Sequence, residues 1–550
     1  MQRPSIFLIL FLLVLLSCSD GTKDETDKKV FKYNQPGALS SLDPAFARNQ
    51  ANIWATTQLY NGLVELDGEL KIGPAIAHSW DVSEDGRSYT FYLRDSVFFH
   101  DHEVFPAGKG RKVTAKDFEY SFKRIIDPST ASTGAWVFND KVLTDVTTGA
   151  ISDTAFLAVN DTTFKIYLNE PFIAFLEILT MPYAYVVPQE AVAEYGKDFR
   201  AHPVGTGPFV FKLWDEGNAI VLHKNPAYWR RDEQGLLLPY LDAVQISFIT
   251  DRKSEFLTFM QGKLDFLSSI TEGSRDMILN NDGTVQEDFA GKFRVQKVPY
   301  LNTEYIGFQL DPAGLKDPNP ALQDKRVRQA LSYAINKREM LAYFRNNIGL
   351  PGHSGIVPPS LPSYNDSLVR GYRYEPKKAL ELLQAAGFSA QHPLQLRLST
   401  VQEHKELAEY MQKKWAEVGV RVQIDINQAP AHQETVDNGR APFFMKSWLG
   451  DYPDAENYLA LFYSKNFSPA GPNKTHFKNT EFDRLYELAK LERDAKKRWA
   501  LYQQMDQIVV EEAPVIVLYY DEVVRLTQNN VQGLVPNPMN TLNLERVRKE

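Results

Sequence analysis

The chain of 550 residues contains a single cysteine, Cys18, so no disulfide can form within it. It also has no excess of positive charge: its formal net charge is −8. Nucleic-acid binding is therefore not expected, because no overall basic field exists to attract a phosphate backbone. After Val30 no apolar run approaches the roughly 20 residues that a membrane-spanning helix needs. The remainder of the chain is expected to be soluble and extracytoplasmic.

Catalytic motifs are scarce as well. The sequence has no H-E-x-x-H, no G-x-S-x-G, no phosphate-binding P-loop and no cysteine nucleophile in a region expected to fold. His100 and His102 in "FFHDHEVF" could offer two imidazoles to one metal ion. No third ligand lies nearby in the sequence, so a polar strand end entering a turn is favoured. We expect neither an enzyme nor a metal or cofactor site.

The N-terminus has the pattern of an export signal. Arg3 precedes an unbroken apolar run over 6–16, which is too short to span a bilayer as a helix but suits a signal peptide. Cys18 follows directly after "LLS", and this arrangement resembles a bacterial lipobox, in which the cysteine is lipidated. An ordinary secretory signal that happens to contain a cysteine is the alternative. The polar residues 19–29 are expected to form a solvated tether.

The rest of the chain mixes strand and helix patterns. Residues 88–94, "SYTFYLR", alternate apolar and polar positions as a half-buried strand does. Residues 327–335 have apolar positions at helical spacing. Within 374–388, Pro376 stands where a helix start accepts proline and Gly387 stands where a helix end prefers glycine. The continuous apolar run over 513–520 suits a buried strand. The fold class is therefore predicted to be α/β.

Nine segments in collinear order carry a resemblance to a known family. They are "SLDPAFA" (41–47), "LYNGLVELDGEL" (59–70), "PAIAHSWDVSEDGRSYTFYLRDSVFFHD" (74–101), "VTAKDFEYSFKRIIDPSTAS" (113–132), "PVGTGPFVF" (203–211), "HKNPAYW" (223–229), "VRQALSYAINKREM" (327–340), "YEPKKALELLQAAGF" (374–388) and "FFMKSWLGDYPDAENYLALF" (443–462). The chain resembles the peptide/nickel class of solute-binding proteins of ABC transporters, which contains dipeptide- and oligopeptide-binding lipoproteins.

The resemblance implies a fold of the type II periplasmic-binding-protein kind, with two lobes closing on a two-stranded hinge and an extra inserted domain. The implied boundaries are a signal peptide over 1–18, a tether over 19–29, a first lobe over 30–73, 204–297 and 513–550, an inserted domain II over 74–203, and a lobe III over 298–512. Such a protein would capture small peptides in the cleft between its lobes, as a monomer held to a membrane by its lipid. It would deliver them to an ABC permease and ATPase complex.

Other solutes of the same class remain alternatives: a nickel complex, haem or an oligosaccharide. A surface hydrolase and a sensor or chaperone without a transporter are further alternatives. The sequence does not decide the length or side-chain preference of a peptide ligand, nor whether the anchor lies in an inner or an outer membrane.

The resemblance also implies site residues. In peptide-binding members the acid of a W-x-x-D element pairs with the α-ammonium of the ligand, and here that acid is Asp451. Trp448 and Tyr452 are expected either to wall the first side-chain pocket or to belong to the core. Asp454 and Glu456 are expected to serve a turn and a helix start, where acids are favourable.

Two departures concern the rest of the ligand. Oligopeptide-binding members carry a tyrosine near the position of Gly134, and Trp136 could replace its contact. They also carry an arginine where this chain has Met445, which leaves the partner of the ligand carboxylate open, because the adjacent Lys446 points to the other face of a strand. Asn49 and Gln50 correspond to a segment that offers backbone groups to the peptide.

Overall fold

The computed structural model describes residues 28–37 and 39–550. Cys18, the predicted signal peptide and most of the predicted tether lie outside the described residues. No helix within the described ranges is long and apolar enough to cross a membrane.

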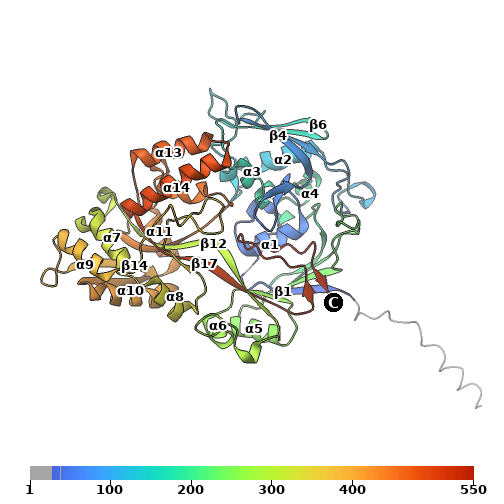
Figure 1. Cartoon of the computed structure of the whole chain (residues 1–550). Helices are drawn as coiled ribbons and strands as arrows, with labels where there is room; N and C mark the ends of the chain where they lie inside the picture. Colours follow the sequence, from blue (N-terminus) through green and yellow to red (C-terminus); the bar gives the residue numbers. More distant parts are fainter. Residues whose placement is uncertain (1–27, 38) are drawn as a thin grey trace, which may run out of the picture.

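One sheet of eleven strands runs through both halves of the protein (Figure 1). Its order is β15-β14-β16-β12-β17-β11-β1-β10-β9-β8, and β13 pairs with β17 beside this path. The strands are β1 (Val30–Asn34), β8 (Phe209–Asp215), β9 (Ala219–Lys224), β10 (Ala243–Ser247), β11 (Phe266–Ser268), β12 (Arg294–Phe308), β13 (Leu350–Pro351), β14 (Leu394–Val401), β15 (Val420–Asn427), β16 (Phe443–Leu449) and β17 (Val515–Thr527).

The antiparallel strands β12 and β17 connect the two halves of the sheet. They cross the middle of the molecule in Figure 1, between the helices of the N-terminal lobe and those of the C-terminal lobe. Their pairing is interrupted between Pro299 and Thr303, where a proline removes a ladder donor. The predicted fold class, two lobes joined by a two-stranded hinge, is confirmed. The segment boundaries given above stay predictions.

The N-terminal lobe carries a separate four-stranded sheet of order β4-β5-β7-β6. Its strands are β4 (Ala77–Val82), β5 (Ser88–Leu93), β6 (Phe156–Asn160) and β7 (Thr163–Tyr167), and the hairpin β2 (Val64–Leu66)–β3 (Ile72–Pro74) precedes them. The predicted alternation is confirmed in β5, because Tyr89, Phe91 and Leu93 are buried and the residues between them are partly exposed. The helices of this lobe are α1 (Gln50–Leu59), α2 (Ala115–Ile126), α3 (Phe175–Ile178), α4 (Gln189–Tyr195), α5 (Arg252–Met260) and α6 (Glu272–Ile278).

The C-terminal lobe is richer in helices. They are α7 (Lys325–Tyr333), α8 (Lys337–Arg345), α9 (Pro376–Ala385), α10 (Lys405–Glu417), α11 (Ala429–Asp437), α12 (Glu456–Leu459), α13 (Thr480–Leu491) and α14 (Ala495–Glu512). The signals read for α9 are confirmed: Pro376 is its first residue, and Gly387 after its end adopts a positive φ of 90°.

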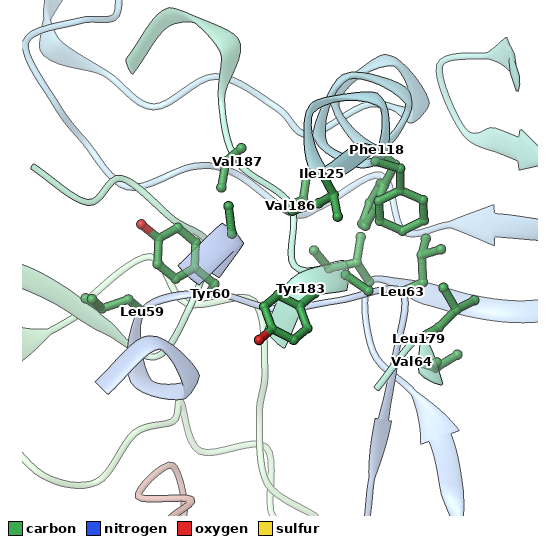
Figure 2. Close-up of a cluster of buried hydrophobic side chains, with 14 of the residues drawn as sticks. Leu59, Tyr60, Leu63, Val64, Phe118, Ile125, Leu179, Tyr183, Val186 and Val187 are labelled. Atoms are coloured by element: carbon green, nitrogen blue, oxygen red, sulfur yellow. The ribbon is translucent and has the colours of Figure 1, made fainter. Parts of the chain in front are cut away.

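An apolar cluster ties the chain after α1 to the inserted sheet and its helices. Leu59, Tyr60, Leu63 and Val64 lie against side chains of the 118–187 region, including Phe118 and Tyr183 (Figure 2). All of them are less than 5% exposed. Burial of such side chains stabilises the folded state by about 1.5–3 kcal/mol each. The segment that carries Tyr183 is therefore held rigidly to the rest of its lobe.

Candidate ligand-binding site

The W-x-x-D element lies where β16 ends and α12 begins. Asn457 in α12 ties its two key residues together through one side chain. Its Oδ1 accepts hydrogen bonds from Trp448 Nε1 at 2.9 Å and from the Asp451 backbone N–H at 3.1 Å. Its Nδ2 donates to Asp451 Oδ2 at 3.3 Å. The loop thus presents the Asp451 carboxylate in one fixed orientation.

The Asp451 carboxylate is partly buried, and its one side-chain partner among the described residues is the neutral amide of Asn457. Burial raises the pKa of its carboxyl group, and the hydrogen bond from Asn457 offsets only part of that rise. Within the described residues no lysine, arginine or histidine forms an ion pair with this carboxylate. A carboxylate that has lost its water without gaining a cation is destabilised, and a ligand ammonium would relieve this.

Tyr183 faces Asp451 from the N-terminal lobe. It lies in the short 3₁₀ helix Pro182–Ala184, and its hydroxyl is hydrogen-bonded to Thr133 Oγ1 at 3.3 Å. Burial raises the pKa of its phenol, and the negative charge of Asp451 raises it further. The Arg48 charge acts on the same phenol in the opposite direction. The Tyr183 phenol thus lies within the electrostatic reach of Asp451 of the C-terminal lobe and of Arg48 of the N-terminal lobe. Arg48 and Tyr183 were not predicted, because no spacing in the sequence links them to Asp451.

The ring of Tyr183 leaves no room for a side chain at position 134, where the chain has glycine. A Cβ atom added at position 134 would lie 2.1 Å from Cδ1 of Tyr183. The tyrosine that the resemblance expects near position 134 is therefore absent for a steric reason, and the ring of Tyr183 occupies the adjoining space.

Trp136 lies close by and is 38% exposed. The Nζ of Lys141 donates to the Trp136 carbonyl at 3.0 Å and lies 5.7 Å from the centre of the indole ring. Burial lowers the pKa of Lys141, and Glu456 of the other lobe opposes this shift. The environment of Trp136 is thus set by the lobe interface.

The other predicted residues have structural partners. Asn49 precedes α1 and its Oδ1 accepts from the Asn52 backbone N–H at 3.0 Å, so its side chain caps the helix that Gln50 begins. Met445 is buried and its sulfur accepts the Thr400 hydroxyl. Lys446 bonds to Gln433 of α11.

Tyr452 belongs to the contact between the lobes. It packs in the same apolar cluster as side chains of the N-terminal lobe and is 5% exposed. Its hydroxyl and that of Tyr486 both donate to Glu456, whose pKa is raised by burial. Asp454 Oδ1 accepts from the Glu456 backbone N–H at 2.8 Å, a turn role. That Glu456 is buried could not be read from the sequence.

Glu177 of α3 faces this acidic segment from the N-terminal lobe. Its Oε2 is buried without a hydrogen-bond partner, and burial, reinforced by Asp454, raises its pKa to about 8. Arg498 lies 4.0 Å from Asp454 and favours the ionised form of Glu177. Burial and the neighbouring acids thus favour the neutral form of Glu177 at the lobe interface.

In the described part of the chain no three His, Cys, Asp or Glu side chains gather as a metal site would need. The ring of His100 bonds to the Gly207 carbonyl at 3.0 Å and accepts from the Gly205 N–H at 3.3 Å. Burial lowers its pKa to about 4. This histidine supports the framework.

A comparison with protein families decides the class. The model described as "Bacterial extracellular solute-binding proteins, family 5 Middle" matches residues 71–469. The chain belongs to this family. It is a solute-binding protein of the ABC-transporter peptide/nickel class, and its relatives are binding proteins rather than enzymes.

Similar proteins cover nearly the whole chain. The dipeptide-binding protein DppE of Bacillus subtilis (strain 168) is 26% identical in an alignment 547 positions long that covers 96% of this chain and 93% of DppE. The dipeptide-binding protein of Escherichia coli (strain K12) is 27% identical in an alignment 544 positions long that covers 95% of each chain. The structure of DppA from Helicobacter pylori in complex with peptide STSA has a TM-score of 0.73 at 25% identity and covers 95% of this chain and 98% of DppA.

Proposed function

We propose that this protein captures small peptides between its lobes and delivers them to an ABC importer. The observation that carries the proposal is the Asp451 carboxylate, which is partly buried at the lobe interface and has no cation partner among the described residues. The α-ammonium of a peptide would supply the missing charge. Names of relatives support this choice of solute, since two of them are dipeptide-binding proteins and a third holds a peptide.

Selectivity follows from the same charge. Removing one partner of a buried ion pair costs about 3–5 kcal/mol, which is about two to four decades in affinity. A site that requires a free ammonium discriminates strongly against sugars and against N-blocked peptides. The peptide amides can bond to backbone groups near Asn49 and Gln50 without regard to side-chain identity. Trp448, Tyr452 and Trp136 are proposed to limit the first side-chain pocket.

Arg48 is our candidate for the ligand carboxylate. It is exposed, forms no ion pair within the described ranges, and lies near enough to Tyr183 for its charge to act on the phenol. Asp451 acts on that phenol from the opposite lobe. A short zwitterion would bridge the two charges and hold the lobes together, so this geometry favours short peptides over long ones.

We also propose that Cys18 carries a lipid, which would hold this monomer at a membrane, facing the periplasm or the cell exterior. The lipobox-like "LLSC" and the polar residues after it support the anchor. A tethered receptor stays near a membrane permease, which increases the local concentration of captured solute.

Native mass spectrometry of the protein purified without denaturation tests the proposal. We expect peptide masses on the wild-type protein and on the control Asp153→Asn, an exposed position of the inserted sheet region, but not on Asp451→Asn. Peptides retained by Asp451→Asn would move the ammonium site elsewhere. A haem, nickel or sugar adduct would replace the proposed solute.

A further inference from the structure

A cavity of about 670 Å³ lies within the N-terminal lobe, away from Asp451. Its walls come from α1, the β2–β3 hairpin, the segments 180–185 and 228–231, and the chain after residue 533. None of its lining residues belongs to the range 298–512. The cavity is therefore separate from the site at the lobe interface, and closure of the lobes is not needed to form it.

Arginines dominate the charge of this cavity. Arg230 is balanced, because its guanidinium lies 2.7 Å from Glu65 Oε1 and 3.1 Å from Glu545 Oε2. The carboxylate of Glu545 is further held by the hydroxyl of Tyr228, which donates at 2.8 Å. Both acids are thus already used, and they do not serve as partners for another cation.

Arg94 lines the same cavity without an ion pair in the described part of the chain. Its Nε donates to the Ala75 carbonyl at 2.9 Å, and its guanidinium lies 5.2 Å from the centre of the Trp229 ring. Arg230 lies 4.6 Å from the same ring. These contacts fix the plane of the Arg94 guanidinium, and its two terminal nitrogens have no acceptor among residues 28–37 and 39–550.

We propose that this cavity is a second binding site, which takes a small organic monocarboxylate through Arg94. A guanidinium held by its Nε presents two parallel N–H donors, and these match the two oxygens of a carboxylate. Ile53, Pro182 and Tyr185 line the cavity and would contact an apolar or aromatic body. This site is distinct from the proposed peptide site and does not depend on it.

A monoanion fits better than a phosphate. Two lining arginines form no ion pair in the described part of the chain: Arg94, and the exposed Arg231, whose guanidinium donates to the Gly235 carbonyl at 2.9 Å. Arg94 balances one charge, whereas the nearby carboxylates of Glu65, Asp67 and Glu545 would repel a dianion. The volume is also in the range of small-molecule sites, which are about 300–1,000 Å³.

Ligand-detected NMR titration of the full chain in a non-ionic detergent tests this site. The ligands are phenylacetate and indole-3-acetate, each compared with its uncharged amide, and inorganic phosphate. We expect the acids to bind more tightly than the amides and phosphate, and Arg94→Gln to weaken acid binding by about 10- to 100-fold. Arg94→Lys should retain part of the affinity. The exposed control Arg87→Gln and the variant Asp451→Asn should bind the acids as the wild type does.

Val535→Trp provides a test that changes no charge. Val535 lines the cavity and is 61% exposed, so a larger side chain there should narrow the opening without disturbing the core. We expect it to weaken binding of acids and amides alike. The proposal is overturned if the acids do not bind at millimolar concentration, if acid and amide bind equally, or if Arg94→Gln or Val535→Trp leaves acid affinity unchanged. Loss of acid binding in Asp451→Asn would place the acids in the peptide site instead.

Discussion

Glu177 makes the stability of the folded protein depend on pH. Its carboxyl has a pKa of about 8 in the fold, against an ordinary value of 4.5, because it is buried and faces Asp454. Glu456 also disfavours its ionised form, and Arg498 favours it. A carboxyl whose folded pKa is raised binds more protons in the folded state than in the unfolded one between these two values. The contribution of Glu177 to the free energy of unfolding is therefore complete below pH 4.5 and is lost as the pH rises through 8.

The magnitude follows from the two pKa values. Between pH 5 and pH 8 the difference in bound protons lowers the free energy of unfolding by about 3 kcal/mol. The variant Glu177→Gln keeps the shape of the side chain and cannot ionise. Its free energy of unfolding should therefore not show this decrease between pH 5 and pH 8. Urea unfolding curves at pH 5, 6, 7 and 8 measure the effect. The variant should gain stability relative to the wild type by about 3 kcal/mol over this range.

The exposed control Glu84→Gln should follow the wild-type pH profile. Parallel profiles for the wild type and Glu177→Gln would refute the reasoning, because they would show that Glu177 is not held protonated by the lobe contact.

Three further predictions concern the site and the anchor. Gly134→Ala should destabilise the protein by about 1–3 kcal/mol and weaken peptide binding, since the new methyl group meets the Tyr183 ring; thermal unfolding and calorimetry measure both. Arg48→Ala should weaken binding of a dipeptide by about tenfold but leave its C-terminal amide unaffected, and an equal loss for both would remove Arg48 from the site. Cys18→Ser should move the protein from the membrane to the soluble fraction, and unchanged fractionation would end the lipoprotein proposal.

Local patterns predicted the elements of the fold well. The alternation in β5 and the terminal signals of α9 depend on neighbouring residues, so the sequence displays them directly. The strand pair that joins the lobes was expected only through the family resemblance, since β12 and β17 lie far apart in the chain.

The site was less accessible to sequence reasoning. Asp451 was named from its W-x-x-D spacing, but the effect of its charge on Tyr183 of the other lobe has no local signature. Glu456 was predicted as a helix-start acid, and α12 does begin there, but no pattern indicated that the fold would bury it between the hydroxyls of Tyr452 and Tyr486. Tertiary contact, which no short pattern records, determined both features.

The most direct test of Asp451 is a double-mutant cycle measured by isothermal titration calorimetry. A dipeptide that the wild-type protein retains and its N-acetyl derivative are each titrated into the wild type and into Asp451→Asn. We expect acetylation of the ligand to lower the affinity of the wild type by about two to four decades. The affinity of Asp451→Asn should fall much less, because this variant lacks the carboxylate that pairs with the ligand ammonium. Equal losses in both proteins would contradict this expectation and show that Asp451 does not bind the ligand ammonium.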